Sequence, residues 1–353
     1  MPTAVPVYFY IPKALWPNEL PSSLDENWAG YGLGLYAWTV QTYLRLRSAG
    51  TQCELTSRLP DEGIVICHSN ALRSQTINPG PRRLLICMKA ESWQSEKATL
   101  HIVQNPSETS LAGNCYFVPH WPQPGLIPRD PSRNDAFETV AFFGHEASIA
   151  PALRSRAWQF ALAERGLRER VVANTNRWNR YSTLDASWND YHDVDAIIAV
   201  RSFNPIRRWV TGRFAYKPAT KLYNAWLSGV IAILGAESAY RETGDYKPGA
   251  GQNYLEVRSF AALLNTLDKL KGDVSLRRSL VAQGTKEVVE YTAAKTVRKW
   301  QVFLEVIAIP AYVEWRGFSP WQRKQALIEA RIASYRDRLA RKSQTTLLST
   351  LPL

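Results

Sequence analysis

The fold is decided by one stretch of this chain: Tyr216-Lys217-Pro218-Ala219-Thr220-Lys221-Leu222-Tyr223-Asn224-Ala225-Trp226-Leu227-Ser228-Gly229, followed by an apolar run over residues 230–234. The pattern predicts a loop, a helix and a buried strand. Pro218 suits the first helical position, where its missing N–H costs nothing. The N–H groups of the first turn then lie beside the ammonium groups of Lys217 and Lys221. Together they form a site for an anion such as a diphosphate.

The same helix carries polar side chains on one face. Lys221, Asn224 and Ser228 follow one another at steps of three and four residues, so they share that face. A polar stripe on a helix that leads into a buried strand is expected where the helix borders a ligand-binding cleft. The alternative is a solvated face near a helix start.

Short apolar segments alternate with helical ones in both directions from this stretch. The expected strands cover residues 5–11, 52–56, 63–68, 83–89, 101–104, 115–120, 139–144, 170–175, 195–201, 230–234 and 254–257. The expected helices cover residues 33–48, 149–165, 218–229, 260–270, 276–291 and 293–308. Near-continuous apolar strands with helical crossings predict an α/β fold with parallel sheets covered on both faces.

A cluster of prolines divides the chain into two halves. We expect an N-terminal Rossmann-like domain over residues 1–120 and a stiff proline-rich linker over residues 121–134. A second Rossmann-like domain follows over residues 135–295, and C-terminal helices over residues 296–345 cross back. Two doubly wound domains joined in this way imply a cleft that faces the carboxyl ends of both sheets, where such folds bind ligands.

The composition limits the class of protein. A formal net charge of +12 indicates an anionic partner, which is a phosphorylated substrate, a membrane surface or a nucleic acid. The four cysteines form no CxxC pair, so we expect neither a disulfide framework nor a zinc site. No signal peptide and no apolar run of spanning length is visible. These features predict a cytoplasmic protein, soluble or attached to a membrane surface.

From about residue 140 to residue 312, the chain resembles the donor-binding domain of the GT-B glycosyltransferases. Retaining members, such as those of family 4, carry on the matching helix a glutamate followed by Ala-Met-Ala-x-Gly-x-Pro and an apolar strand. Here the sequence reads Asn224-Ala225-Trp226-Leu227-Ser228-Gly229-Val230-Ile231. The family's lysine three residues before that glutamate corresponds to Lys221, and another lysine, four residues earlier, to Lys217. The resemblance implies two facing Rossmann-like domains that bind a sugar nucleotide.

The chain departs from this family at two charged positions. Many retaining members have two glutamates in this region, and the corresponding residues here are Tyr216 and Asn224. An asparagine can hydrogen-bond ribose hydroxyls but supplies no charge. The loop that lies near the sugar in the family is matched by residues 235–239, which include Glu237 and Ser238. Glu237 either binds sugar hydroxyls or favours the start of the next helix.

A glycine-rich segment precedes the first predicted helix. Gly30, Gly32 and Gly34 resemble the loop by which the acceptor domain of these enzymes approaches the donor phosphates. A dinucleotide fingerprint would need GxGxxG directly after the first strand, whereas here the spacing is GxGxG and some twenty residues intervene. The alternative is a tight turn that uses the conformational freedom of glycine.

Three further residues are candidates for the chemistry. Arg201 lies at the carboxyl end of a predicted strand, where ligands bind. It either stabilises the leaving diphosphate or pairs with a local carboxylate. His68 ends a strand of the first domain and is our candidate for the base that deprotonates an acceptor hydroxyl, the alternative being a structural histidine. His145 follows the first strand of the second domain and is placed to reach a donor phosphate.

The triplet Asp193-Val194-Asp195 spells DxD, the metal-binding signature of the other glycosyltransferase fold, GT-A. In that fold the motif ends a strand, whereas here it begins one and so lies at the amino ends of the strands, opposite to the ligand-binding end of the sheet. We therefore expect no metal requirement and no cofactor.

The C-terminal segment is basic and amphipathic. Residues 314–342 contain eight basic and three acidic residues. An apolar stripe recurs at steps of seven, four, three and four: Trp321, Ile328, Ile332, Tyr335 and Leu339. Such a helix either lies on an anionic membrane or packs its stripe against the N-terminal domain, and we favour the second.

The sequence as a whole predicts a metal-independent, hexosyltransferase-like enzyme. It would move a sugar from a nucleotide-sugar donor to a glycan, lipid or small-molecule acceptor. One alternative is a sugar-nucleotide epimerase or hydrolase on the same fold. Another is a non-enzymatic, basic polyanion-binding protein, whose binding would fall steeply with salt and show no nucleotide preference. No recognisable nucleic-acid motif is present, so nucleic acid is not an expected partner.

Overall fold

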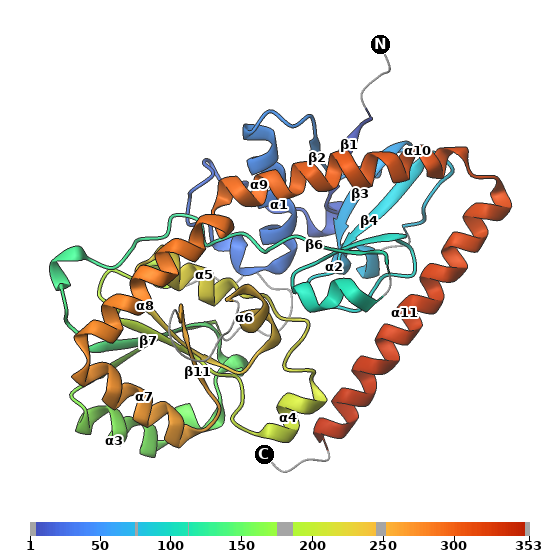
Figure 1. Cartoon of the computed structure of the whole chain (residues 1–353). Coiled ribbons are helices and arrows are strands. Elements are labelled where there is room, and N and C mark those ends of the chain that lie inside the picture. Colours follow the sequence, from blue (N-terminus) through green and yellow to red (C-terminus); the bar gives the residue numbers. More distant parts are fainter. Residues whose placement is uncertain (1–4, 75–76, 112, 175–185, 245–251, 350–353) are drawn as a thin grey trace. The chain divides into compact units, whose positions relative to one another are not determined.

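The computed structural model of the chain describes residues 5–74, 77–111, 113–174, 186–244 and 252–349, and it divides into two units (Figure 1). Unit 1 consists of Met1–Leu24, Gly30–Trp121 and Ala293–Leu353, and unit 2 consists of Asp25–Ala29 and Pro122–Thr292. The segment predicted as a linker therefore belongs to unit 2 from Pro122 onward. The C-terminal helices belong to unit 1.

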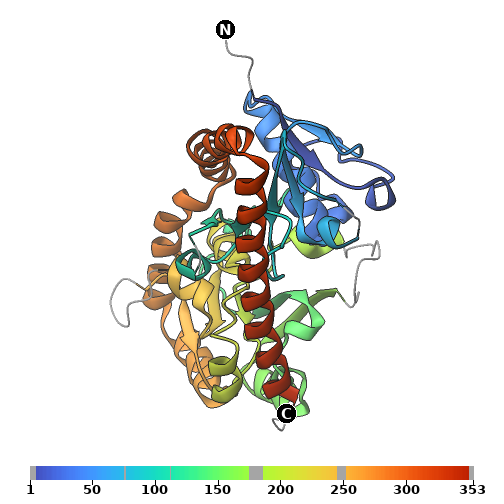
Figure 2. The same cartoon turned by 90° about the vertical axis from the view of Figure 1, so that its right-hand side faces the viewer.

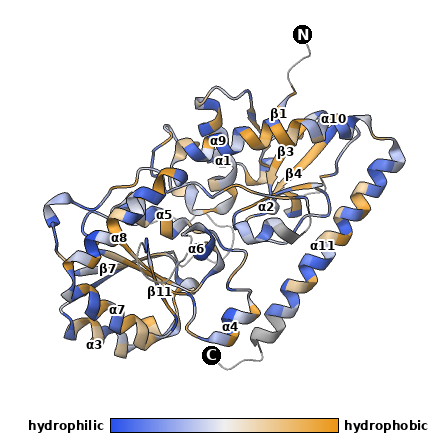
Figure 3. Cartoon of the chain, in the orientation of Figure 1, coloured by the Kyte–Doolittle hydropathy of each residue, from blue (hydrophilic) through white to orange (hydrophobic). Residues whose placement is uncertain are grey.

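Unit 1 is built on a parallel sheet of six strands in the order β2-β1-β3-β4-β5-β6. The strands are β1 (Val7–Tyr10), β2 (Glu54–Thr56), β3 (Gly63–His68), β4 (Arg83–Met88), β5 (Leu100–Val103) and β6 (Cys115–Phe117). β3 is buried along its whole length, and its apolar sequence is visible in Figure 3. Such a strand must be covered on both faces of the sheet.

Five α-helices accompany this sheet in the described part of unit 1. They are α1 (Gly34–Ser48), α2 (Ser69–Ser74), α9 (Ala293–Val302), α10 (Ile309–Gly317) and α11 (Pro320–Ser349), with a π-helical segment at Phe303–Ala308. α1 packs against β1 and β3, and α10 packs against β3 and β4. The core on this face joins Trp38 of α1 and Trp300 of α9 to Phe9 of β1.

Unit 2 is built on a parallel sheet of five strands in the order β11-β10-β9-β7-β8. The strands are β7 (Thr139–His145), β8 (Arg168–Asn174), β9 (Ala196–Ala199), β10 (Ile231–Gly235) and β11 (Leu255–Val257). The helices are α3 (Arg156–Glu164), α4 (Pro205–Val210), α5 (Thr220–Leu227), α6 (Ser238–Thr243), α7 (Phe260–Gly272) and α8 (Val274–Glu287).

Alternate residues of β7 belong to two different cores. Phe142 packs in the core that contains Trp158 of α3, and Phe143 packs in the core that contains Trp226 of α5. Because successive side chains of a strand point to opposite faces, helices cover both sides of this sheet. Each sheet therefore has the doubly wound order in which the first strand lies between the second and the third. The predicted α/β class, with two doubly wound halves and C-terminal helices, is confirmed.

Two predicted helix starts are wrong. α5 begins at Thr220 rather than at Pro218, because the N–H groups of Leu222 and Tyr223 both bond to the carbonyl of Ala219. The segment expected as one helix over residues 149–165 contains a 3₁₀ turn (Pro151–Arg154) before α3 begins at Arg156. Ser155 causes the late start, since its side chain accepts a hydrogen bond from the N–H of Trp158.

Candidate functional site

Each doubly wound sheet has a point at which the chain changes direction between its first and third strands. In unit 2 these strands are β7 and β9, and their carboxyl ends lie side by side because the two strands pair in parallel. Ligands of such sheets bind outside the carboxyl ends at this switch point. Gly144 and His145 end β7, and Arg201 follows β9.

Lys221 lies against the end of β7. A side chain built on Gly144 would place its Cβ 2.9 Å from Lys221 Nζ, which is closer than real Cβ contacts allow. Gly144 also has a φ of 153°, a backbone conformation that other residues rarely adopt. The Nζ atom lies 5.3 Å from the centre of the Phe142 ring, within the range of a cation–π interaction. A side chain at position 144 would therefore require the lysine side chain to shift.

The backbone before α5 is unusual. Gly212, Arg213 and Phe214 have φ values of 56°, 55° and 58°, so three successive residues are left-handed and two of them are not glycine. The turn is closed by a hydrogen bond from the N–H of Lys217 to the carbonyl of Phe214. Lys217 thus lies three residues before α5, with its Nζ 5.3 Å from the centre of the Tyr216 ring. Non-glycine residues in this conformation store strain, and such strain concentrates at functional sites.

Arg201 and Glu237 form an ion pair at the ends of β9 and β10. Arg201 Nε donates to Glu237 Oε2 at 2.9 Å, and only 2% of the Glu237 side chain is exposed. Glu237 Oε1 is buried and has no hydrogen-bond partner among the described residues. Arg201 therefore pairs with a local carboxylate, which was one of its two expected roles. The Glu237 side chain makes no capping hydrogen bond to α6, the helix that follows it.

Two other predicted donor contacts lie near these groups. His145 Nδ1 accepts a hydrogen bond from the N–H of Ala147 at 3.1 Å, which leaves the imidazole half-buried at the end of β7. Ser238 is the first residue of α6, and its N–H bonds to the carbonyl of Arg213. The start of α6 is therefore joined to the left-handed turn before α5.

Asn224 does not fit the predicted role of a donor ligand. Its side chain is buried, and its Oδ1 accepts a hydrogen bond from the N–H of Gln123 at 3.1 Å. It also hydrogen-bonds the hydroxyl of buried Tyr191. The amide therefore ties α5 to the segment after Pro122, and the three-and-four spacing alone could not distinguish this from a ligand contact.

In unit 1 the switch point lies between β1 and β3, and His68 ends β3 there. Gly30 and Gly32 belong to a 3₁₀ turn (Ala29–Gly32), and Gly34 begins α1. A Cβ at Gly34 would lie 3.5 Å from His68 Nε2, an ordinary contact. Gly34, at the start of α1, therefore lies next to His68, at the end of β3.

His68 is not arranged as a base. Its Nδ1 accepts a hydrogen bond from the N–H of Asn70 at 3.1 Å, so the proton of the neutral ring is on Nε2. Burial lowers the pKa of His68 to about 3. Nε2 is buried and has no partner within the described part of the chain. The side chain therefore offers an N–H donor rather than a lone pair that could take a proton.

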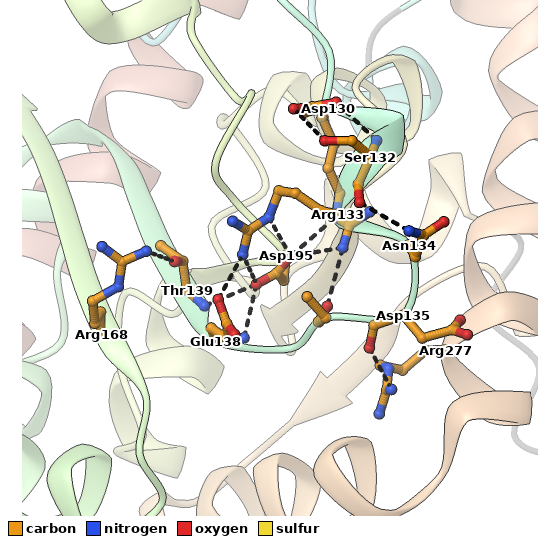
Figure 4. A network of polar contacts seen from close by, with 12 residues as sticks. Asp130, Ser132, Arg133, Asn134, Asp135, Glu138, Thr139, Arg168, Asp195 and Arg277 are labelled. Atoms are coloured by element: carbon orange, nitrogen blue, oxygen red, sulfur yellow. Dashed lines mark hydrogen bonds and ion pairs between the residues drawn. The ribbon is translucent and has the colours of Figure 1, made fainter.

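The DxD triplet directly precedes β9, at the amino end of that strand. Figure 4 shows the network of polar contacts around its last residue, Asp195. Asp195 accepts hydrogen bonds from Arg129, Arg133 and the N–H groups of Glu138 and Thr139. Asp193 pairs with Arg170 at 2.6 Å. These arginines already neutralise both carboxylates. Over the residues that the structure describes, no three His, Cys, Asp or Glu side chains are grouped to hold a metal ion.

No model of a known protein family matches the sequence, and no curated protein sequence matches it. Among solved structures, the chain is similar to HepE from Anabaena in complex with UDP-glucose, at 12% identity over 86% of this chain and 100% of that one, with a TM-score of 0.46. It is also similar to a glycosyltransferase from Rickettsia africae, at 8% identity over 86% and 98%, with a TM-score of 0.46. Sucrose-phosphate synthase from Thermosynechococcus elongatus follows at 14% identity over 70% and 74%, with a TM-score of 0.44. These likenesses are too distant to carry an argument about activity, and the fold is defined by its two strand orders.

Proposed function

We propose that this protein is a GT-B glycosyltransferase of the hexosyltransferase kind. It would move a sugar from a nucleotide-sugar donor to a glycan, lipid or small-molecule acceptor. The observation that carries the proposal is the position of Lys221, whose ammonium group lies against Gly144 at the switch point of unit 2. An ammonium group at this point, beside the N-terminus of α5, suits an anion better than a neutral ligand.

The diphosphate of the donor is the natural anion for this position. In glycosyl transfer the bond between the sugar and the diphosphate breaks, so negative charge develops on the leaving oxygen. We assign Lys221, Lys217 and the first N–H groups of α5 to that charge, with His145 at the end of β7 as a further contact. A charge-assisted hydrogen bond of this kind contributes about 1.5–3 kcal/mol.

The hydroxyl groups of the donor need acceptors, and Glu237 offers one. Its Oε2 is occupied by Arg201, whereas its Oε1 is buried without a partner among the described residues. Burying an unsatisfied carboxylate oxygen is costly, which favours a ligand hydroxyl at this atom. We assign Arg201, Glu237 and Ser238 to the sugar or the ribose, and we leave Asn224 out of the donor site.

For the acceptor we propose the switch point of unit 1. Gly30, Gly32 and Gly34 would bring backbone close to the substrate, and His68 would donate a hydrogen bond from Nε2. The reaction proposed here uses neither a metal ion nor a cofactor, because charge on the diphosphate is met by lysines. Four free, buried cysteines suit a reducing compartment, so the cytoplasm is the proposed location.

The test is the binding of UDP, GDP, ADP, CMP and dTDP to the wild-type protein and to the Lys221→Ala variant, with EDTA present. Selective binding of one nucleotide is expected, weakened between about tenfold and a hundredfold in the variant. Lys286→Ala removes an exposed lysine of α8 in the same unit and serves as the matched control, with unchanged affinity. Equal weakening in both variants would contradict a specific role for Lys221.

A further inference from the structure

The last helix of the chain, α11, has one face that is fixed to unit 1. It has 30 residues, and Figure 2 shows it as a single straight helix. The hydroxyl of Ser334 donates to the carbonyl of Gln94 at 2.7 Å, and the N–H of Gln94 donates to Asp337 at 2.8 Å. Ala330, one turn before Ser334, is buried. These contacts determine which side of α11 faces the rest of unit 1.

A buried group of charges holds the same face. Lys89 is only 3% exposed, and it pairs with Glu108 and, at 3.4 Å, with Asp337. Arg341 lies 3.1 Å from both Glu108 and Asp337. Rotating α11 about its axis would separate four buried or half-buried charges, which is strongly unfavourable. The rotation of the helix is therefore fixed.

The apolar stripe of α11 lies on the opposite side, so the expectation that it packs against the N-terminal domain is wrong. Its members have exposed fractions of 46–70%: Trp321, Ile328, Ile332, Tyr335 and Leu339. At 100° per residue, the stripe centre lies roughly 150° from the centre of the packed face. Figure 3 shows these apolar positions recurring between hydrophilic ones along α11. Five large exposed side chains in one line indicate an interaction surface.

A row of basic residues follows one edge of the stripe. Lys324, Arg331, Arg338 and Lys342 recur at steps of seven, seven and four, and all four are exposed. This edge lies about 70° around the helix from the stripe. The acidic residues of α11 are elsewhere, since Asp337 belongs to the packed face and Glu329 lies beyond the other edge of the stripe. The basic edge therefore contains no acidic residue of α11, and the acidic contact that it makes is the exposed pair of Arg331 with Glu96 of unit 1 at 3.4 Å.

We propose that α11 docks this protein on an anionic lipid surface. The helix would lie flat, with its apolar stripe in the headgroup–acyl boundary and its basic edge among the anionic headgroups. The stripe covers about 27 Å of helix from Trp321 to Leu339, and Trp321 and Tyr335 have the amphipathic rings that favour membrane interfaces. A second copy of the chain fits less well in an antiparallel pairing of the two stripes, because the two basic edges would then meet.

The test is co-flotation of the full-length protein with vesicles of phosphatidylcholine alone or with 30% phosphatidylglycerol added. Wild-type protein is expected to float with the anionic vesicles and to be released by high salt. A stripe variant, Ile328→Ser with Ile332→Ser, is expected to bind at least tenfold more weakly. An edge variant, Arg331→Gln with Arg338→Gln, is expected to bind anionic vesicles about tenfold or more weakly than the wild type. Its binding to neutral vesicles should equal that of the wild type.

The control variant is Phe160→Ser, which removes an exposed aromatic ring, 69% exposed, from α3 of unit 2. It should bind vesicles as the wild type does. All four substituted side chains of α11 are exposed, so the circular dichroism spectrum and nucleotide binding should be unchanged. A failure of the membrane proposal can therefore be distinguished from a failure of the proposed enzymatic function. Absence of wild-type flotation, or equal flotation of the stripe variant, would overturn the proposal. A dimer in sedimentation that the stripe variant abolishes, without flotation, would assign the stripe to a second copy instead.

Discussion

At the level of single residues, the candidate donor site depends on the absence of a side chain at Gly144. The ammonium of Lys221 occupies space that any side chain at position 144 would need. Beside it, Glu237 holds Arg201 through one oxygen and leaves the other unpaired within the described residues. Glu237 is buried and Lys221 is half-buried, and a charge that is removed from water needs a partner.

The Gly144→Ala variant tests this arrangement. The added methyl group is expected to displace Lys221 and to strain a backbone with a φ of 153°, which weakens nucleotide binding by about tenfold or more. Gly50→Ala is the matched control, because Gly50 also has a positive φ but has nothing within 4 Å of a new Cβ. Both variants should lose some stability, and calorimetry should show weaker binding only for Gly144→Ala. Equal affinities in the two variants would show that Lys221 is not placed by this glycine.

Part of this site could be predicted from the sequence. Lys217 lies at the start of a predicted helix and Lys221 lies in its first turn. Arg201 ends a predicted strand and Glu237 follows another, so the sequence predicts that these residues lie near the ends of elements. The left-handed turn at Gly212–Phe214 could not be predicted, because Arg213 and Phe214 normally avoid that conformation. The roles of Asn224 and His68 stay predictions, and the hydrogen bonds that they make could not be predicted, because sequence spacing gives only the face of a helix or the end of a strand.

Two buried histidines of unit 1 predict how its stability changes with pH. Burial lowers the pKa of both His68 and His101 to about 3. The unfolded chain takes up protons below pH 6.5, whereas the folded unit stays neutral until about pH 3. Stability is therefore complete above pH 6.5 and falls as the pH drops toward 3, by about 2 kcal/mol per histidine between pH 7 and pH 5. Urea unfolding at several pH values measures this loss, and His68→Gln should remove about half of it. A stability that is constant from pH 7 to pH 5 would contradict the burial of these rings.

At the scale of elements, α11 shows why a helical period does not by itself locate a buried face. The apolar stripe predicted the helix correctly, but the packed face is made of small and charged residues such as Ala330, Ser334 and Asp337. The partners of these residues, Lys89 and Gln94, are more than two hundred residues away in the sequence. A contact between such distant polar groups leaves no periodic signal.

The Asp337→Asn variant tests the attachment of α11. Removing the charge leaves Lys89 and Arg341 with Glu108 alone, which is expected to cost about 3 kcal/mol, the lower end for a broken buried pair. Hydrogen exchange should then quicken along α11 from Leu327 to Arg341. The control is Arg331→Gln, which breaks an exposed pair with Glu96 at 3.4 Å and should change exchange little. Similar exchange in both variants would mean that the buried charges do not hold the helix.

At the level of the whole molecule, the positions of the strands along the chain could largely be predicted from the sequence. Each predicted strand corresponds to an observed one, since runs such as Gly63–His68 are apolar enough to require burial on both faces. The sequence also indicated two α/β halves. It did not indicate that Asp25–Ala29 belongs to unit 2, because a five-residue segment carries no composition signal. A helix long and apolar enough to span a membrane is absent from the described ranges.

The central claim is that the switch point of unit 2 binds a nucleotide diphosphate through Lys221. Isothermal titration of the nucleotide panel into wild-type, Lys221→Ala and Lys286→Ala proteins, in EDTA, tests it most directly. We expect saturable binding of one nucleotide, an affinity that is about tenfold to a hundredfold lower in Lys221→Ala, and an unchanged affinity in Lys286→Ala. Absence of binding to every nucleotide by folded wild-type protein would contradict the claim and favour a basic polyanion-binding protein.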